Sequence, residues 1–462
     1  MKWADPVAIV HRISPSRISV FCQSFENNQL LRECEITNPK RHLDSEEIAG
    51  RKLFPYYAGF SSKFVENILP TLNLRSGARV LDPWNGSGTT TIAAFNQGLT
   101  AIGSDLNPAM VLVAKAAFVS RYDVESLIPL AYSITEKLSD HVEGVEEDPL
   151  GNWFHPRSVA LVRAIEGRIN RTLVSHSAYL PLDSCCALEK VTPLAAIFYL
   201  ALFRVVRRWT QDFVASNPTW TRLAKSAEEK KRLTKKDISE QFVQEIKLLC
   251  EHRERFPVYS DTDQSRLQLL LSNAEALPLE SETVEAIITS PPYCTRIDYA
   301  VATYVELAVL RIGGEKFSTL RRNLTGSSTV QKNAIAVNPA WGETCQAFLN
   351  AVYEHPSKAS KTYYFKNHLQ YFDSLYRSLN EATRVLAPQA PCVLVVQNSY
   401  YKEIRNDVAA IVGEMTQGLG MRLKKQADFS ASRSMVDMNK RSQKYIGNRS
   451  TFESVLLFEK IS

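Results

Sequence analysis

The chain has 462 residues, of which 45% are hydrophobic and 23% are charged, and its formal net charge is +6. This composition is that of a globular protein with two or three domains, and it excludes a low-complexity or disordered chain. The eight cysteines include no C-x-x-C pair, so neither a disulfide framework nor a zinc site is expected. The first residues do not resemble a secretory signal, and we expect a reduced, cytoplasmic protein.

Residues 77–116 follow the order strand, glycine-rich turn, helix, strand, helix. ARVLD (78–82) predicts a buried strand, TTTIAAFNQ (89–97) a helix that ends at Gly98, and TAIGSD (100–105) a second strand. Asn107 and Pro108 suit the N-cap and first turn of the next helix. Because strands alternate with helices here, a parallel sheet with helices on its faces is predicted.

The α/β pattern is interrupted at residues 124–264, which are mainly helical by periodicity, and it resumes afterwards. The interruption contains a predicted core helix at 194–203. The later predicted elements are strands at 266–271, 284–289, 392–397, 421–429 and 453–460, and helices at 365–385 and 404–418. We therefore predict a Rossmann-like α/β domain of about seven strands, formed by residues 46–123 and 265–462 and interrupted by a helical insertion at 124–264. Residues 1–45 have no assigned role.

A glycine-rich turn and an acidic residue after the second strand indicate a ligand site. Gly86 and Gly88 stand between a strand and a helix N-terminus, where a ligand can approach the backbone closely. Asp105 suits a ribose diol. Ile92 stands where a dinucleotide fingerprint has its third glycine, and Asp82 would repel a pyrophosphate but attract the cationic amino end of S-adenosylmethionine. For the two glycines alone, a tight turn without a ligand is the alternative.

The strand at 284–289 ends in the sequence SPPY, residues 290–293. Two prolines cannot continue a strand's hydrogen-bond ladder, and they hold the backbone rigidly extended. The Ser290 hydroxyl and the proline carbonyls can then bind an exocyclic amino group, while Tyr293 can stack on a planar base. A nucleobase turned out of a duplex needs this combination. A proline-stiffened turn without a ligand is the alternative.

DPWNGSGTT (82–90), SDLNP (104–108) and SPPY resemble the cofactor and catalytic motifs of the DNA amino-methyltransferases, which methylate cytosine N4 or adenine N6. The resemblance implies the S-adenosylmethionine-dependent methyltransferase fold, S-adenosylmethionine as cofactor, double-stranded DNA as substrate with base flipping, and no metal or membrane. It also implies a restriction-modification system, with a cognate restriction or defence nuclease as a possible partner. The serine form of the catalytic motif is associated mainly with cytosine N4. Trp84 replaces the family's usual phenylalanine.

The resemblance assigns site residues by position. Asn273 or Glu275 would approach the cofactor adenine, and the segment containing Phe54 and Tyr56 would line its methionine end. The predicted catalytic residues are Ser290, Pro291, Pro292 and Tyr293. The predicted cofactor-binding residues are Phe54, Tyr56, Asp82, Pro83, Trp84, Gly86, Gly88, Thr89, Asp105 and Asn273. We expect direct methyl transfer without a cysteine nucleophile, because Cys392, although it follows Pro391, opens an apolar strand.

A basic segment in the insertion is a candidate DNA-binding region. Residues 204–236 carry ten basic and three acidic residues with interleaved aromatics. A solvated helical face is the competing interpretation. A polar loop at 321–333 is a second candidate. The predicted DNA-binding residues are Arg207, Arg208, Trp220, Arg222, Lys225, Arg321 and Arg322.

The sequence predicts a site-specific DNA methyltransferase acting on cytosine N4. Three alternatives remain: an adenine-N6 DNA methyltransferase, an RNA guanine-N2 methyltransferase with a similar proline motif, and a DNA-binding homologue that has lost catalysis.

Overall fold

The structure is a computed structural model of the chain. It describes residues 36–39, 54, 59–139, 141, 147–215, 219–251, 263, 265–294, 297–331, 335–430 and 451–461.

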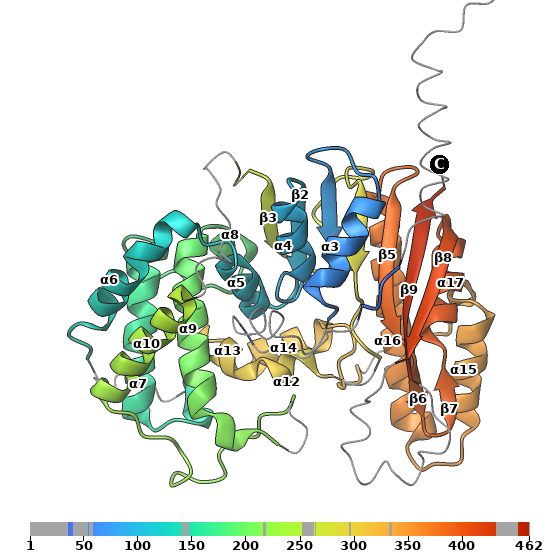
Figure 1. Ribbon diagram of the computed structural model, residues 1–462. Coiled ribbons are helices and arrows are strands. Elements are labelled where there is room, and N and C mark those ends of the chain that lie inside the picture. Colours follow the sequence, from blue (N-terminus) through green and yellow to red (C-terminus); the bar gives the residue numbers. More distant parts are fainter. Residues whose placement is uncertain are drawn as a thin grey trace, which may run out of the picture.

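A seven-stranded sheet forms the centre of the fold, in the order β3-β2-β1-β4-β5-β9-β8 (Figure 1). Its five neighbouring strands from β3 to β5 run parallel, and β9 pairs antiparallel with both β5 and β8. The strands are β1 (Arg79–Asp82), β2 (Thr100–Asp105), β3 (Leu267–Leu271), β4 (Ala286–Thr289), β5 (Pro391–Gln397), β8 (Met421–Ser430) and β9 (Phe452–Lys460). The predicted Rossmann-like methyltransferase fold with about seven strands is confirmed.

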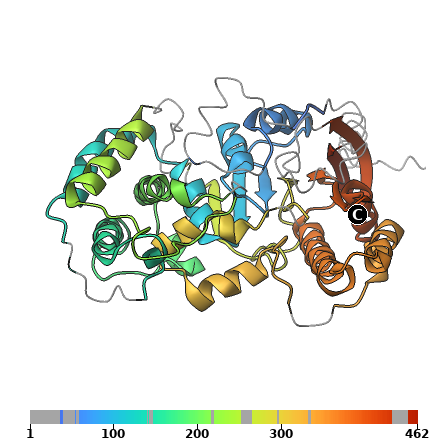
Figure 2. The same ribbon diagram turned by 90° about the horizontal axis from the view of Figure 1, so that it is seen from below.

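Helices cover both faces of the sheet because neighbouring strand residues point to opposite sides. Val80 packs into a core with α3 (Ser62–Thr71) and α4 (Thr89–Asn96), whereas the next residue, Leu81, packs into a core on the other face. Figure 2 shows the two layers from below. The helices of the second face are α15 (Glu343–Glu354), α16 (Phe365–Val385) and α17 (Val408–Gly418).

The insertion is largely helical, as predicted, and forms its own core beside the sheet (Figure 1, green). Its buried helix α9 packs against α5, which follows β2 and thereby joins the two cores. The helices are α5 (Pro108–Ala116), α6 (Val124–Thr135), α7 (Pro156–Ile169), α8 (Cys185–Glu189), α9 (Pro193–Trp209) and α10 (Lys235–Cys250). Within the described residues, no helix combines the length and apolar character that a membrane span requires.

Strand β3 follows the insertion in sequence but lies beside β2, with Leu269 opposite Gly103. The insertion therefore leaves the sheet after α5 and returns to it at the edge strand. After β4 the chain continues through three helices, α12 (Tyr299–Ala302), α13 (Tyr304–Val309) and α14 (Gly314–Asn323). These helices lie between the insertion and α16 in Figure 2.

The predicted helix at 404–418 is too long by four residues. Residues Ile404–Asn406 form strand β7 of a hairpin with β6 (Ser399–Tyr401). Helix α17 begins only after Asp407, whose side chain accepts a hydrogen bond from the Ala410 N–H. This N-cap satisfies a helical donor, which explains the later start. The predicted helix at 365–385 matches α16.

Candidate active site

The turn after β1 depends on two glycines in the left-handed region, with φ of 50° at Gly86 and 89° at Gly88. Gly88 is the N-cap of α4, and a Cβ there would lie 3.3 Å from the Cβ of Ala114 in α5. Gly88 therefore allows α4 to begin close against α5. A third glycine, Gly103 of β2, makes room for the Asn85 side chain, because a Cβ at Gly103 would lie 2.5 Å from that side chain.

Asp105 holds this turn at the end of β2. Its two carboxylate oxygens accept hydrogen bonds from the Gly86 N–H at 2.9 Å and the Asn107 N–H at 2.8 Å. Asn107 caps α5 through the Ala109 N–H, as predicted from the sequence. One carboxylate thus fixes both the glycine turn and the start of the next helix.

Asp82 lies at the end of β1 with only 3% of its surface exposed. The Thr289 hydroxyl donates to its Oδ1 at 2.6 Å and the Trp84 N–H donates at 3.1 Å. Burial raises the pKa of Asp82 to about 6 in spite of these hydrogen bonds, and burial likewise raises the pKa of Asp105 to about 6. Two ionisable carboxylates close together in a cleft suit a ligand that carries positive charge and hydroxyl donors.

The proline shelf, which we define as residues 290–293, follows β4 and is fixed from two sides. The Tyr371 hydroxyl of α16 donates to the Pro292 carbonyl at 2.9 Å, and the Tyr293 N–H donates to the Tyr299 hydroxyl at 3.3 Å. The Pro292 carbonyl is thus already occupied by a donor. In the described part of the chain, no group donates to the Ser290 hydroxyl or to the Pro291 carbonyl.

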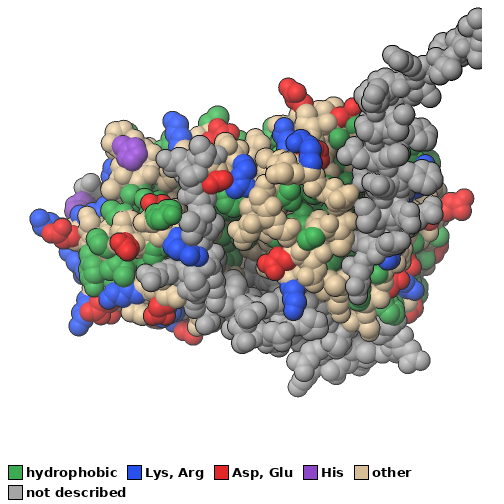
Figure 3. Space-filling model, turned by 45° about the horizontal axis from the view of Figure 1, so that its top comes forward, with side chains coloured by type: hydrophobic (Ala, Val, Ile, Leu, Met, Phe, Trp, Pro, Cys, Tyr) green, Lys and Arg blue, Asp and Glu red, His purple; other side chains and the backbone are tan. Residues whose placement is uncertain are grey.

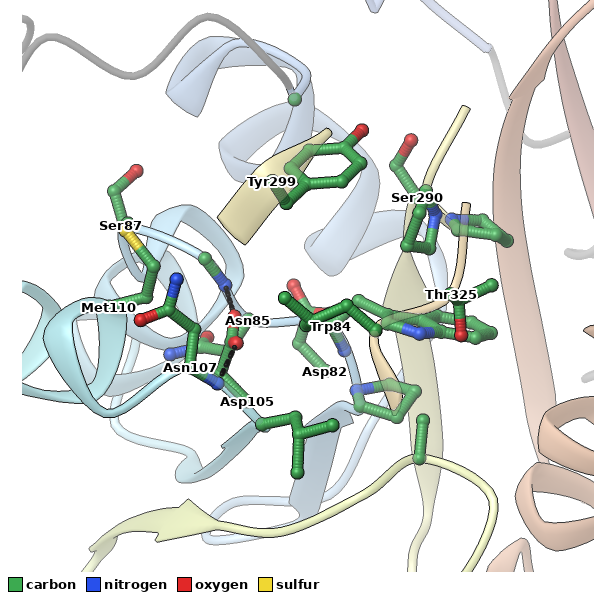
Figure 4. Close-up of a pocket in the computed structure, with 18 of the residues that line it drawn as sticks. Asp82, Trp84, Asn85, Ser87, Asp105, Asn107, Met110, Ser290, Tyr299 and Thr325 are labelled. Carbon is green, nitrogen blue, oxygen red and sulfur yellow. Dashed lines mark hydrogen bonds between the residues drawn. The ribbon is translucent and has the colours of Figure 1, made fainter. Parts of the chain in front are cut away.

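Both motifs line one pocket at the carboxyl ends of β1, β2, β3 and β4. Figure 4 shows Asp82 and Asp105 on one side of it and Ser290 on another, with the Tyr299 ring between them at the top. The predicted site residues that line the pocket are Asp82, Pro83, Trp84, Gly86, Thr89, Asp105, Asn273, Ser290, Pro291, Pro292 and Tyr293. Glu275, the alternative to Asn273, lies in a neighbouring polar pocket, where it pairs with Arg377 at 2.8 Å.

Three of the predicted cofactor-binding residues are not among the residues that line the pocket. Gly88 packs against α5 and does not line the pocket. Phe54 is buried beneath the guanidinium of Arg207, 5.3 Å from its ring centroid, and does not line the pocket either. Tyr56 lies outside the described residues.

The sequence reasoning missed several lining residues. Asn85, Ser87, Leu106, Asn107 and Met110 are neighbours of the recognised motifs, so their proximity in sequence was a usable signal. The segment 323–325 belongs to the loop 321–333, which was predicted to contact DNA and not to line this pocket, and it reaches the pocket from the end of α14. The remaining lining residues are Gly59, Phe60, Ala274 and Tyr299.

Cys392 is fully buried in β5, and burial raises the pKa of its thiol to about 12. A thiol of this kind is neither ionised nor accessible at neutral pH, so it does not serve as a nucleophile. Among the described residues, no group of three His, Cys, Asp or Glu side chains is arranged to hold a metal ion.

Two of the predicted DNA-binding arginines form ion pairs within the protein. Arg207 forms a two-pronged ion pair with the fully buried Glu306, at 2.6 Å for each bond, and donates to the Ala302 carbonyl. Arg321 binds Asp298 at 2.8 Å. Both guanidinium groups are mostly buried and neutralised within the protein, so they order the helices that follow the proline shelf. This pairing makes them the weakest of the predicted DNA contacts.

The other predicted DNA-binding residues lie on the surface, and three of them form ion pairs with glutamates. Arg208 pairs with Glu245, Arg222 with Glu229 and Arg322 with Glu315. Trp220 and Lys225 are both exposed, Trp220 at 41% of its surface. On the face seen in Figure 3, blue Lys and Arg side chains lie interspersed with red Asp and Glu side chains over the helical insertion. Their DNA contacts stay predictions.

Substitution of Arg207 by methionine is expected to destabilise the protein by about 3 to 5 kcal/mol, because it leaves Glu306 buried without its partner. Urea denaturation would measure the loss. The double variant R207M/E306L is expected to recover most of it, since no charge is then left unpaired. A loss below about 1 kcal/mol, the range of surface pairs, would contradict the structural role.

No family model matches the chain, but several curated proteins are similar to it. The Type II methyltransferase M.BsoBI of Geobacillus stearothermophilus is 26% identical over 283 residues, which cover 58% of this chain and 54% of that protein. The Type II methyltransferase M.AvaI of Anabaena variabilis is 23% identical over 80% of this chain and 79% of its own length. The Type II methyltransferase M.MvaI of Kocuria varians is 22% identical, with 84% of each chain covered. The chain thus spans about half of M.BsoBI.

Proposed function

We propose that this chain, a relative of the Type II DNA methyltransferases, transfers a methyl group from S-adenosylmethionine to the exocyclic N4 amino group of cytosine in a specific sequence of double-stranded DNA. The observation that carries the proposal is the shared pocket, in which the cofactor turn and the proline shelf face one space. Recognition of the DNA sequence is assigned to the helical insertion. The proposal includes a cytoplasmic location and a cognate restriction or defence nuclease as a candidate partner.

The pocket residues fit S-adenosylmethionine. The raised pKa of Asp82 reflects a buried carboxylate that gains from a cation, and the amino acid end of the cofactor supplies one. Asp105 has the position expected of a carboxylate that binds a ribose diol at the end of the second strand. Asn273 and Ala274 would border the adenine. When bound, the cofactor supplies an electrophilic methyl group on a sulfonium.

The proline shelf would orient the amine. Ser290 and the Pro291 carbonyl are acceptors without partners in the described part of the chain, and together they suit the two N–H bonds of an exocyclic amine. Accepting both protons would aim the nitrogen lone pair at the methyl group and stabilise the positive charge that develops on nitrogen. The Tyr293 ring would stack on the base. As the new N–C bond forms, the S–C bond would break and the cofactor would leave as a neutral thioether. The cationic nitrogen would then release one proton to solvent, so no covalent intermediate is needed.

The preference for cytosine N4 over adenine N6 rests on Ser290 and on the family resemblance. The two activities are distinguished by incubating the protein with labelled S-adenosylmethionine and duplex DNA and analysing the nucleosides by mass spectrometry. N4-methylcytosine is the expected product. N6-methyladenine would correct the target base only. Transfer to RNA alone, or cofactor binding without transfer to any nucleic acid, would overturn the proposal.

Cofactor affinity is expected to depend on pH. In the free protein Asp82 and Asp105 have a pKa of about 6, and the ligand needs both ionised. Affinity should therefore be greatest at about pH 7 to 8, where both carboxylates are ionised and the cofactor's amino group is still largely a cation. It should fall as the pH drops below about 6, by up to about tenfold per pH unit for each carboxylate. Binding near pH 6 should release protons, which calorimetry in two buffers of different ionisation enthalpy detects. Affinity that stays constant between about pH 5 and 8 would refute this assignment.

A further inference from the structure

A surface of exposed tyrosines and lysines lies next to the pocket, around the π-helical turn Ser360–Tyr364 that precedes α16. We call it the tyrosine-lysine surface. Its residues are Tyr353, Lys358, Lys361, Tyr363, Tyr364 and Lys366, and all six are exposed. A π-helical turn is rare and is often found at functional sites. Large exposed aromatic rings on a folded domain also call for an explanation, since burial would be favourable.

The lysines of the tyrosine-lysine surface are not neutralised by acidic side chains in the described part of the chain. Lys358, Lys361 and Lys366 have no carboxylate within ion-pair distance in the described part of the chain. Lys361 instead lies over the Tyr353 ring, with its Nζ 4.7 Å from the ring centroid. In this respect the surface differs from the basic segment of the insertion, where Arg207 and Arg208 are neutralised by glutamates. Free lysines among aromatic rings are typical of a nucleic acid contact.

A chain of contacts connects this surface to the proline shelf. The Tyr363 hydroxyl donates to the Ser328 carbonyl at 2.7 Å, and the Ser328 hydroxyl donates to Asp298, the N-cap of α12. Between them, Gly326 lies so close to the shelf that a Cβ there would be 3.0 Å from the Tyr293 carbonyl oxygen. The tyrosine-lysine surface is therefore separated from Tyr293 by a single loop, residues 324–331.

We propose that the tyrosine-lysine surface binds the phosphate backbone of duplex DNA beside the base that enters the pocket. The inference rests on the proposed function, because it takes DNA as the partner. A nucleotide seated against Tyr293 brings its flanking phosphates past loop 324–331, where the three ammonium groups can replace released counterions. Tyr363 and Tyr364 would contact sugar or unstacked bases. DNA would thus be held between this surface and the helical insertion.

The test compares two variants of the full chain for binding to a fluorescent DNA duplex, measured by anisotropy between about 50 and 200 mM salt. The first is K358Q/K361Q/K366Q. The control is R422Q, which changes an exposed arginine at the start of the edge strand β8, at the end of the sheet opposite the pocket. Affinity for S-adenosylmethionine is measured on both and is expected to equal that of the unaltered protein, which shows that the variants are folded.

The triple variant is expected to bind DNA about tenfold more weakly, and R422Q to bind normally. The slope of log affinity against log salt should fall by about 0.9 for each phosphate that the variant no longer neutralises. Unaltered affinity and slope in the triple variant, from a protein that does methylate DNA, would overturn the surface alone. Weakened binding to an RNA duplex with unchanged binding to DNA would overturn it too. Failure of the unaltered protein to methylate DNA would instead refute the proposed function.

Discussion

Replacement of Ser290 by alanine is expected to lower kcat for methyl transfer by about 100-fold, which is the usual loss when one preorganised polar group facing a developing charge is removed. The hydroxyl has no partner in the described part of the chain, so its removal breaks no internal hydrogen bond. Strand β4 is held on both sides by β1 and β5, and the shelf is held by Tyr371. The affinity for S-adenosylmethionine should therefore stay within about twofold, because the cofactor side of the pocket keeps its hydrogen bonds.

Two changes at Tyr293 provide matched controls for this result. Tyr293→Phe keeps the ring and removes only a hydroxyl that donates to Glu453 at 3.2 Å, so most turnover should remain. Tyr293→Ala removes the stacking surface and should lower turnover strongly, since base stacking on an aromatic ring contributes about 1 to 3 kcal/mol. Single-turnover kinetics with saturating cofactor would separate these effects. A Ser290→Ala enzyme with unchanged single-turnover rate, or one that fails to bind the cofactor, would mean that the shelf has another role.

Replacement of Asp82 by asparagine is expected to weaken S-adenosylmethionine binding by about 100-fold, which is the worth of a charge-assisted hydrogen bond. The asparagine can still accept from Thr289 and Trp84, so the local structure should persist. The same change is expected to stabilise the cofactor-free protein. In the fold the pKa of this carboxyl is raised to about 6, so its ionised form destabilises the fold above that pH.

The sign of this stability effect provides an internal check. At about pH 7.5 the gain should approach about 3 kcal/mol, and it should disappear below about pH 4, where Asp82 is protonated in the unfolded chain as well as in the folded protein. Urea denaturation at several pH values, together with calorimetric titration of the cofactor, measures both quantities. Unchanged cofactor affinity would show that Asp82 does not face the cationic end. A loss of stability at about pH 7.5 would show that its ionised form has a partner.

The sequence was sufficient for those parts of the site that are local. Asp82, Gly86 and Asp105 lie within one strand-turn-helix-strand unit, and turn chemistry and helix capping determine how they are placed. The proline shelf was equally readable, because two prolines at the end of a buried strand restrict the backbone directly. The helix at 365–385 was predicted to its bounds because its buried residues recur at helical spacing along its whole length.

The parts that depend on tertiary contacts could not be read in this way. Thr325 reaches the pocket because a loop is fixed between α14 and α16, where its hydroxyl pairs with Ser374. Arg207 was predicted to contact DNA because it lies in a cluster of basic residues with interleaved aromatics, whereas its ion-pair partner Glu306 lies 99 residues away in sequence. The tyrosines near residue 363 were also overlooked, since only the structure reveals that this helical turn leaves them exposed next to loop 324–331.

The central claim is that a base and a cofactor meet in the pocket between Asp82 and Ser290. A crystal structure of the protein with cognate duplex DNA and a nonreactive analogue of S-adenosylmethionine tests it most directly. We predict a cytosine turned out of the duplex and stacked on Tyr293, with its N4 atom bound by Ser290 and the Pro291 carbonyl, about 3 to 3.5 Å from the position of the methyl group. A cofactor bound away from Asp82 and Asp105, or DNA bound with every base still paired, would contradict it.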